Sequence, residues 1–434
     1  MNSLRLKNVI LLTVDTLRKD VLGCYNPESK LTPFIDSLQD RCIKFTNMQA
    51  IGPYTQASFP GILTSSYYFD WGRHKKCPPQ RILISEVLKK GGITTAGIHS
   101  NPYISEFFGW NRGWDFFYDS MEEEVTDEVP YINGDKINKK VDEWLSSHIK
   151  GKDYGRFFLW MHYMDVHEPY VPERRYVEMV DPSIKLSSNE MFNLFKNVIL
   201  KRDVSDKEKV ELLKKLYFAH VREIDEYVQD FFSILKRYNL LENSTVIITS
   251  DHGEEFMEHG AFGHSGIRYV SHLYQELLWV PLIIWHPSIT KKKVETPVST
   301  ADIVPTILAA NGIRAYNLDG ENILGNAKSA VRILFSEASL YNYRRGIMRI
   351  GPGERIALAV RIRNWKLIYY DDPHKKPELY NLSKDPKEKE NLIDVHRDLA
   401  QEIIKHIVKK RIKKIKRDLV QQSIYERVCK VFNY

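Results

Sequence analysis

Short apolar runs alternate along the chain with longer segments whose apolar residues recur at helical spacing. The short runs are residues 8–15 (NVILLTVD), 93–101 (ITTAGIHSN), 156–165 (RFFLWMHYMD), 244–255 (STVIITSDHGEE) and 280–287 (VPLIIWHP). The first is apolar at successive positions, which predicts a strand buried on both faces. Strands separated by helical segments predict an α/β fold built on one sheet.

The pattern changes after about residue 326. Before it, residues 81–92, 207–241 and 300–313 have helical patterns. After it come shorter strand-like pieces, including ALAVRIRNWKLIYYDD, and then a basic helical segment. We therefore predict a main domain at 1–325, a smaller α+β subdomain at 326–394 and a basic amphipathic helix at 395–434.

The positive charge of the chain is concentrated in that last helix. Residues 405–417 (KHIVKKRIKKIKR) contain eight Lys and Arg and no acid, so removing them changes the net charge from +7 to 7 − 8 = −1. Apolar residues at 404, 407, 408, 412, 415 and 419 trace one helical face. One interpretation is a helix packed on the body with a solvated basic face. The other is weak contact with an anionic surface, either lipid or nucleic acid.

Composition indicates a globular protein that can bury a sizeable core. The chain has 434 residues, of which 43% are hydrophobic and 27% charged. It contains no apolar run of 18 residues, and the N-terminal apolar run is not followed by a small-residue cleavage site. The four cysteines (Cys24, Cys42, Cys77 and Cys429) form no C-x-x-C pair and are interpreted as free thiols. Together these features predict a cytoplasmic protein.

Three of the predicted strands end in residues that can hold a metal ion or an anionic ester. Asp15 ends the first run, residues 162–167 contain two histidines and an aspartate, and Asp251 and His252 end the fourth. The carboxyl ends of parallel strands line the binding site in open α/β sheets. Carboxylate and imidazole ligands suit Zn, Mn and similar divalent ions.

Each of these residues also has a purely structural interpretation. An Asp at a strand end can cap the next turn, and His162, still inside its strand, can be a hydrogen-bonded core residue. His259 and His264 lie in a glycine-rich segment, MEHGAFGHSGIR, where the backbone can approach a ligand closely. Each histidine alone is ambiguous, so the case for chemistry depends on the combination.

The order of these segments resembles the sulfatase family of the alkaline phosphatase superfamily. The matching segments within residues 8–394 are NVILLTVDTLRKDVLGCYN with TPFIDSL, GPYTQASFPGILTS, FLWMHYMDVHEPY, VIITSDHGEEFMEHGAFGH, LYQELLWVPLII, RNWKLIYY and ELYNLSKDPKEKENL. The resemblance implies a large mixed, mostly parallel sheet between helices. It also implies a small C-terminal domain with an antiparallel sheet and a helix.

The same resemblance implies a divalent metal ion held by Asp15, Thr55, Asp251 and His252. Many sulfatases have a second acid after the first Asp, but here that position is Thr16, so one carboxylate is missing. One ion (Mn, Zn, Ca or Mg) is expected. Asp165, His167 and His264 are the candidates for holding a second ion.

The resemblance also indicates residues that contact the substrate. His167 and His264 would stabilise the ester oxygens or protonate the leaving group. His264 has two rivals for its position, Arg268 and His272. His99, Asn101 and Asp165 complete the candidate substrate-binding set, which also includes His167 and His264.

Thr55 stands where sulfatases have the residue that becomes formylglycine. The sulfatase motif C-x-P-S-R or S-x-P-S-R falls on Thr55-Gln56-Ala57-Ser58-Phe59. Threonine is a secondary alcohol and cannot be processed to formylglycine, and Phe59 replaces the arginine that supports the aldehyde hydrate. A metal-bound Thr hydroxyl can attack as an alkoxide. The alternatives are that Thr55 only caps a helix or that Ser58 is the nucleophile.

The sequence therefore predicts a metal-dependent phosphodiesterase or phosphoryl transferase that acts on a small phosphate or sulfate ester through Thr55. Two alternatives remain open. One is a sulfuric ester hydrolase that works without formylglycine, and the other is a non-catalytic binding protein on the same scaffold. No basic motif with interleaved aromatic residues indicates a specific nucleic-acid partner.

Overall fold

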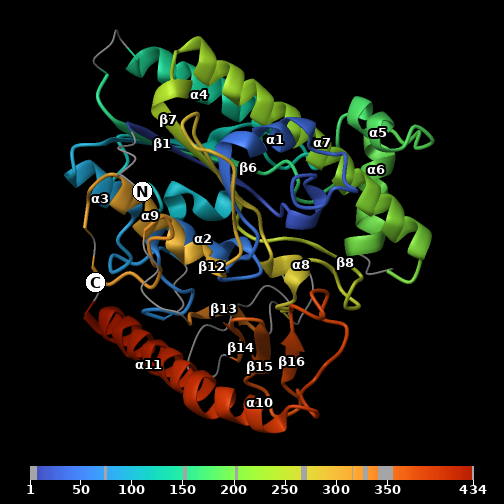
Figure 1. Ribbon diagram of the computed structural model, residues 1–434, viewed down its shortest axis with the longest axis vertical. Helices are drawn as coiled ribbons and strands as arrows, with labels where there is room; N and C mark the ends of the chain where they lie inside the picture. The colour runs from blue at the N-terminus through green and yellow to red at the C-terminus, as the bar shows by residue number, and fades with distance from the viewer. Residues whose placement is uncertain are drawn as a thin grey trace.

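An eight-stranded sheet forms the centre of the molecule (Figure 1). The computed structural model describes residues 7–72, 76–149, 154–200, 204–264, 271–314, 316–325, 331–340 and 355–432. The strand order is β11-β2-β10-β7-β1-β6-β4-β5. The bounds are β1 Asn8–Val14, β2 Cys42–Phe45, β4 Thr94–His99, β5 Phe116–Asp119, β6 Phe157–Tyr163, β7 Ser244–Ser250, β10 Leu282–Trp285 and β11 Lys292–Val294.

The sheet is mixed and mostly parallel, as the resemblance implied. β7, β1, β6, β4 and β5 are parallel neighbours, whereas β10 runs antiparallel to both β7 and β2. Strands carrying Asp15, Asp251 and the His162–His167 segment are adjacent, because β1 lies between β7 and β6. The three polar strand ends therefore meet at one edge of the sheet.

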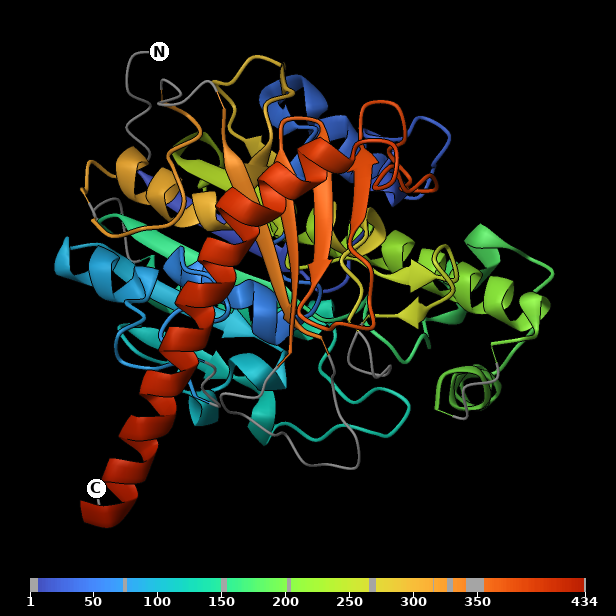
Figure 2. The same ribbon diagram turned by 90° about the horizontal axis from the view of Figure 1, so that it is seen from below.

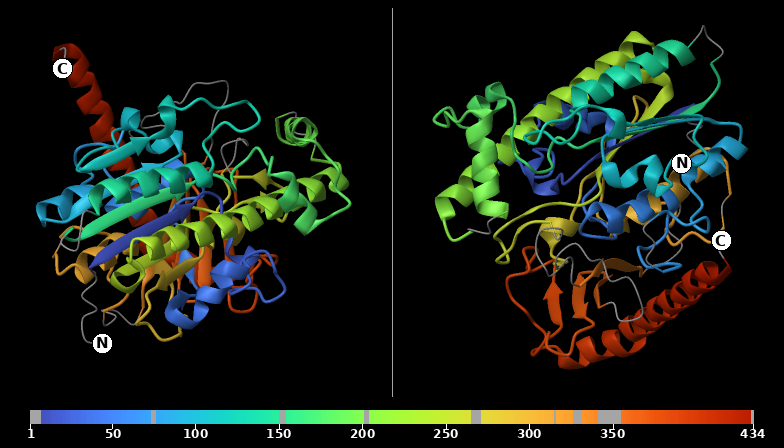
Figure 3. Two further views of the ribbon diagram at one scale, coloured as in Figure 1. Left: turned by 90° about the horizontal axis from the view of Figure 1, so that it is seen from above. Right: turned by 180° about the vertical axis from the view of Figure 1, so that it is seen from behind.

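Helices cover both faces of this sheet (Figures 1 and 3). One layer contains α1 (Pro33–Ser37), α4 (Gly134–His148) and α7 (Lys207–Arg237), and the other contains α2 (Thr55–Thr64), α3 (Ile84–Lys90) and α9 (Ile303–Ala310). β1 explains the arrangement, because Val9 and Leu11 enter one apolar core while Ile10 and Leu12 enter the other. α5 (Arg174–Val180) and α6 (Ser188–Phe195) extend the first layer beside α7.

A second, smaller sheet follows in the chain. It has the antiparallel order β13-β14-β15-β16, with bounds Ile333–Ser339, Ile356–Ile362, Trp365–Tyr370 and Glu378–Asn381. The long helix α11 (Lys409–Phe432), preceded by α10 (Arg397–Ile403), crosses the outer face of this sheet (Figure 2). The expected small sheet-and-helix region is present, and the boundaries at 326 and 395 stay predictions. Among the described residues, no helix has the length and apolarity needed to cross a membrane.

The first strand of the small sheet binds the segment that leads into α2. The Glu337 N–H donates to the carbonyl of Ile51 at 2.8 Å, and the Ser336 hydroxyl donates to the carbonyl of Ala50 at 2.6 Å. The Ser339 N–H donates to the Tyr54 hydroxyl at 3.1 Å. The small sheet therefore fixes the backbone immediately before Thr55.

A fully buried ion pair joins the small sheet to the short helix α8 (Gln275–Leu278). The Lys366 ammonium on β15 lies 2.7 Å from Oε1 of Glu388, and both side chains have no exposed surface. Lys366 also donates to the Gln275 side chain at 3.1 Å, and the Gln275 N–H donates to Glu388 at 2.6 Å. Each buried charge is thus paired and hydrogen-bonded, which is what burial requires.

We predict that Lys366→Met lowers the free energy of unfolding by about 3–5 kcal/mol, because it leaves the Glu388 carboxylate buried without a cation. Chemical denaturation followed by fluorescence measures this change. The double variant Lys366→Met/Glu388→Gln should recover most of the loss, since the amide still accepts from Gln275. Equal loss in the single and double variants would contradict this account.

Candidate active site

Asp15, Asp251 and His252 converge at the carboxyl ends of β1 and β7. These strands pair in parallel with Val14 opposite Ser250, so each Asp is the next residue beyond the paired ends. Ligand-type atoms of the three residues lie within 4.8 Å of one another. The His252 Nε2 atom is 3.6 Å from Asp15 Oδ1 and 3.4 Å from Asp251 Oδ2.

The chemistry of this group fits a divalent cation. Asp15 Oδ1, Asp251 Oδ2 and His252 Nε2 are buried and have no hydrogen-bond partner. The Nδ1 of His252 faces the carbonyl of Gly253 at 2.9 Å. Because a carbonyl only accepts, Nδ1 carries the hydrogen and Nε2 presents its lone pair to the two carboxylates, as in metal-binding histidines.

The charges in this group lead to the same conclusion. Burial raises the pKa of Asp251, and the neighbouring Asp15 carboxylate raises it further. Burial lowers the pKa of His252 to about 3, which keeps the imidazole neutral and able to bind a metal. Two close carboxylates without access to water favour a cation between them. Asp15, Asp251 and His252 would hold it, and a carboxylate-imidazole set suits Mn, Zn or Mg.

The second oxygen of Asp15 organises the rest of the site. Asp15 Oδ2 accepts from the Asn101 side chain at 2.8 Å and from the Thr55 hydroxyl at 3.4 Å, and His162 Nε2 lies 3.4 Å away. Burial by itself raises the pKa of Asp15, but the His162 hydrogen bond and the nearby imidazoles outweigh it and hold this pKa well below its usual range. Asp15 is therefore a carboxylate with several donors around it.

Thr55 is the first residue of α2, and its hydroxyl faces the carboxylates. The N-cap residue is Tyr54, whose side chain makes no capping bond. The Thr55 hydroxyl donates to Asp15, and Asn101 Nδ2 lies 3.4 Å from it. A threonine that served only as a cap would accept from the helix backbone instead. The hydroxyl thus points toward the Asp15 carboxylate and does not bond to its own helix backbone.

Ser58 and Phe59, in the same helix, have supporting positions. The Ser58 hydroxyl donates to the carbonyl of Asp251 at 2.5 Å, which joins α2 to the end of β7. Phe59 is fully buried, and its ring meets the edges of Trp110, Trp160 and His162. Neither side chain supplies the positive charge that the arginine of the sulfatase motif would bring.

Three imidazole rings lie close together beside the carboxylates. The His264 ring centroid lies 4.7 Å from that of His252 and 4.8 Å from that of His167. The Nδ1 of His264 is 3.1 Å from Oε1 of Glu254, a fully buried residue whose other oxygen accepts from the Tyr170 hydroxyl at 2.7 Å. Burial lowers the pKa of His264, but Glu254 outweighs burial and raises it to about 10. His264 is therefore a fixed cation at neutral pH.

His167 differs from His264 in its protonation. Its Nδ1 lies 2.6 Å from the carbonyl of Glu168, so Nδ1 carries the hydrogen and Nε2 is left as an acceptor. Burial lowers the pKa of His167, and the repulsion from His264 adds to this. The site therefore combines one cationic and one neutral imidazole, which suits an anion anchor beside a base.

Asp165 does not join these residues. Its Oδ1 accepts from the Gly134 N–H at 3.0 Å, at the first residue of α4, and the carboxyl is fully buried. Asp165 therefore anchors the loop that carries His167 to a helix N-terminus, and burial raises the pKa of its carboxyl well above the usual range. Within the described ranges, the only group of three or more metal-competent residues is Asp15, Asp251 and His252. The structure does not assemble the second ion site from Asp165, His167 and His264.

His99 is enclosed by aromatic rings rather than open to a substrate. It is fully buried in β4, its ring stacks on Trp160 at a centroid distance of 5.6 Å, and Phe117 lies 5.0 Å away. Burial lowers its pKa to about 4, so it is a neutral core histidine. Asn101, two residues further on, is the member of this segment that reaches Asp15.

The remaining histidine candidates belong to the junction with the small sheet. His259 Nε2 lies 3.3 Å from Glu276, and its ring stacks on Tyr274 at 3.7 Å. His272 pairs with Glu255 at 3.1 Å. Arg268 lies outside the described residues. Of the two rivals that the structure describes, His264 and His272, His264 is the one that lies beside His252.

Sequence reasoning missed one residue of this site and left the role of a second one open. Glu254 was not considered, although it directly follows the D-H-G triplet and its acid type is a weak signal for a histidine partner. His162 was interpreted as a core residue, and it is fully buried, but it also contacts Asp15. Its Nδ1 is 2.8 Å from the Thr13 hydroxyl, so it orients Asp15 from inside the sheet.

We predict that Asp251→Asn lowers the bound divalent metal from about one ion per chain to less than about a tenth, because it removes a charged ligand. Elemental analysis after equilibration with Mn, Zn, Mg or Ca measures this. Asp165→Asn is the matched control, since it changes the same group type in a residue that only anchors a loop, and should keep its metal. Retention by the first variant, or loss by the second, would contradict the assignment.

We predict that Glu254→Gln lowers the pKa of His264 from about 10 to below its ordinary value of 6.5, since burial then acts alone. Titration of the labelled imidazole by NMR measures it. His264 has a raised folded-state pKa, so its stabilisation is full below pH 6.5 and is lost as pH rises through about 10. The variant should therefore lose roughly 5 kcal/mol of folding free energy at pH 6 and almost nothing above pH 10.

Comparisons with known proteins identify the family of the chain and relatives of its fold. A family model described as "Sulfatase" matches residues 7–313, and one described as "N-sulphoglucosamine sulphohydrolase, C-terminal" matches residues 258–418. The chain is 23% identical to an ulvan-active sulfatase of Formosa agariphila over 73% of this chain and 64% of that protein. It is 31% identical to arylsulfatase K of Bos taurus over 43% and 34%. The chain thus spans less than two thirds of the length of these relatives.

Solved structures share the fold. A protein in complex with its substrate D-glucosamine-2-N,6-O-disulfate superimposes with a TM-score of 0.75 at 18% identity, covering 95% of this chain and 98% of that one. The phosphonate monoester hydrolase of Agrobacterium radiobacter gives 0.73 at 18% identity, covering 94% and 96%. Because the sulfatase model matches well over half of its length, the chain belongs to the sulfatase family.

Proposed function

We propose that this chain is a metal-dependent phosphodiesterase or phosphoryl transferase in which Thr55 is the nucleophile. The observation that carries the proposal is the direction of the Thr55 hydroxyl, which donates to Asp15 within the metal-binding group instead of capping its helix. Formylglycine cannot form at a threonine. The hydroxyl itself is then the group in position to attack.

A bound divalent ion would supply Lewis acidity, lowering the pKa of the Thr55 hydroxyl and offsetting charge on the ester oxygens. Asp15 accepts the hydroxyl hydrogen bond, and Asn101 holds Asp15 in place. The new bond joins Thr55 Oγ1 to phosphorus, and the bond from phosphorus to the leaving oxygen breaks. The proton that Thr55 loses ends on the leaving oxygen, so the first half-reaction gives a phosphothreonine ester and releases an alcohol.

The two outer imidazoles have separate roles in this scheme. His264, kept cationic by Glu254, attracts a negative ester oxygen. His167, with a free Nε2, takes the proton of the water or alcohol that attacks phosphothreonine in the second half-reaction. The bond from phosphorus to Thr55 Oγ1 breaks in this step, and Oγ1 regains a proton. Water as the attacking group gives hydrolysis, and an acceptor alcohol gives transfer.

Charge favours a monoanionic group. His264 is the one imidazolium that we place beside the metal-binding residues, so the described site offers limited positive charge besides the ion. A phosphodiester carries a single charge, whereas a phosphomonoester carries close to two at neutral pH. This balance supports the diester over the monoester.

A sulfate ester is the second candidate, because it is also a monoanion. Relatives of the chain include the ulvan-active sulfatase and a choline-sulfatase of Rhizobium meliloti, which is 23% identical over 80% of this chain and 64% of that protein. Those names favour sulfate, whereas Thr55 and Phe59 favour phosphorus. An activity panel separates the two.

We predict that Thr55→Ala lowers kcat/KM for bis(4-nitrophenyl) phosphate at least about 1000-fold, since the attacking atom is removed. Thr55→Ser should stay within about tenfold, because it restores a hydroxyl. The assays use Mn, Zn, Mg and Ca, with 4-nitrophenyl phosphate, phosphonate and sulfate for comparison. Intact-mass analysis of quenched enzyme should reveal a phosphoryl adduct in wild type and none in Thr55→Ala.

Three results would count against the proposal. Unchanged turnover in Thr55→Ala would exclude the nucleophile. Faster sulfate cleavage than any phosphorus ester would establish the second candidate. No turnover of any ester by metal-loaded protein would favour a binding protein on a hydrolase scaffold.

A further inference from the structure

The outer side of α11 carries a continuous stripe of exposed residues. Lys409, Lys413, Lys416, Val420 and Ile424 are spaced by three or four positions, so they share one helical face. All five are exposed, with 42% of Val420, 56% of Ile424 and 46% of the Lys416 side chain accessible. We call these five residues the α11 stripe.

The stripe cannot turn inward, because the opposite face of α11 is packed. Ile412, Ile415 and Leu419 are buried in the core that includes the small sheet. Arg411 lies 2.5 Å from Glu337 and 3.0 Å from Asp70, and all three are nearly inaccessible. This double ion pair fixes the rotation of the helix about its axis.

The charge of the stripe is largely uncompensated. Lys409 and Lys413 form no ion pair within the part of the chain that the structure describes. Lys416 pairs with Asp371 at 2.8 Å, but that pair is exposed and therefore weak. Lys405 and Lys410, also exposed, widen the basic surface. Such a surface attracts an anionic partner.

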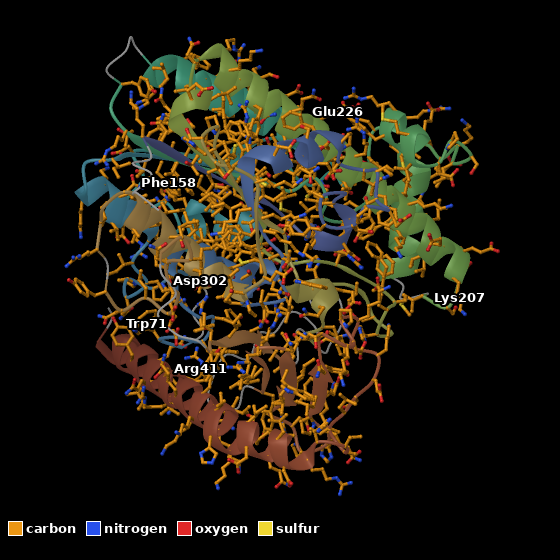
Figure 4. All side chains as sticks on the ribbon, viewed as in Figure 1. Trp71, Phe158, Lys207, Glu226, Asp302 and Arg411 are labelled. Carbon is orange, nitrogen blue, oxygen red and sulfur yellow. The ribbon has the colours of Figure 1, made fainter. Side chains whose placement is uncertain are left out.

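The position of the helix leaves the stripe accessible to a large flat partner. α11 lies along the outer edge of the molecule, and its C-terminal half projects beyond the body (Figures 2 and 3). Side chains point outward along its length (Figure 4). A planar surface could therefore contact several turns at once.

We propose that the α11 stripe docks the protein on an anionic lipid surface. The helix lies in the interface plane, the lysines contact the negative headgroups, and Val420 and Ile424 enter the apolar boundary layer. Basic and apolar residues on one line fit a bilayer, which is charged outside and apolar beneath.

Two other occupants fit the stripe less well. A nucleic-acid backbone offers charge but no apolar layer for Val420 and Ile424. A second copy of the chain would bring lysines close to lysines across a symmetric contact. The proposal is independent of which ester the site cleaves, because no residue of the stripe belongs to the site.

The test is co-sedimentation of the full chain with vesicles. Wild type should bind phosphatidylcholine vesicles containing phosphatidylglycerol and not pure phosphatidylcholine vesicles. Each lysine contributes about fivefold to the partition coefficient. The partition coefficient of Lys409→Glu/Lys413→Glu/Lys416→Glu should therefore be about 100-fold lower than that of wild type, or lower still. The partition coefficient of Val420→Asp/Ile424→Asp should fall about tenfold or more, although this variant keeps all the lysines.

Lys291→Glu/Lys292→Glu/Lys293→Glu is the matched control, since it makes the same charge change at the exposed edge around β11. It should bind like wild type, and all variants should keep the wild-type Tm. Equal binding by the stripe variants and the control would overturn the proposal. The proposal would also be overturned if wild type did not bind anionic vesicles at low salt. Tighter binding to duplex DNA than to vesicles, unchanged in Val420→Asp/Ile424→Asp, would indicate a nucleic-acid partner instead. A dimer in sedimentation that is lost in the stripe variants would indicate a second copy of the chain.

Discussion

The site depends on one constraint: the carboxylates of Asp15 and Asp251 lie close together and are buried from solvent. Asp15 and Asp251 leave adjacent parallel strands in register, and both are fully buried. Unpaired, they would repel each other and weaken the fold. The surrounding groups reduce that cost for Asp15, because Asn101, Thr55 and His162 all approach one of its oxygens. The other oxygen, with Asp251 and His252, is left for a cation.

The small sheet matters to this site although it contributes none of its residues. Through β13 it holds the backbone that leads into Thr55. Through Lys366 and Glu388 it holds α8, where the carbonyl of Leu277 accepts from the Gly253 N–H at 2.8 Å. A Cβ on Gly253 would lie 1.9 Å from the Glu276 carbonyl oxygen, so only glycine lets α8 approach the residue after His252 so closely. Both sides of the metal-binding group are thus clamped by one subdomain.

Sequence patterns predicted the sheet and the residues at its edge, because both follow from the order of apolar and polar residues along the chain. Apolar runs that end in Asp predict where β1 and β7 stop, and parallel strands bring those ends together. The patterns could not tell which neighbours turn toward the site. His99, still inside β4, points to a sheet face and packs on Trp160, whereas Asn101, beyond the strand end, reaches over the edge. Asp165 was misplaced because its partner, Gly134, is 31 residues away in the chain.

The environment of Phe59 suits an apolar ring at the position where the sulfatase motif has arginine. Phe59 is fully buried among Trp110, Trp160 and His162. An arginine at position 59 would bury its guanidinium among these aromatic rings and the imidazole. None of these contacts offers a carboxylate, and burying an unpaired charge costs free energy. Restoring a convertible residue at position 55 would therefore not restore its supporting arginine. The space one turn beyond Thr55 in α2 is filled by an apolar ring.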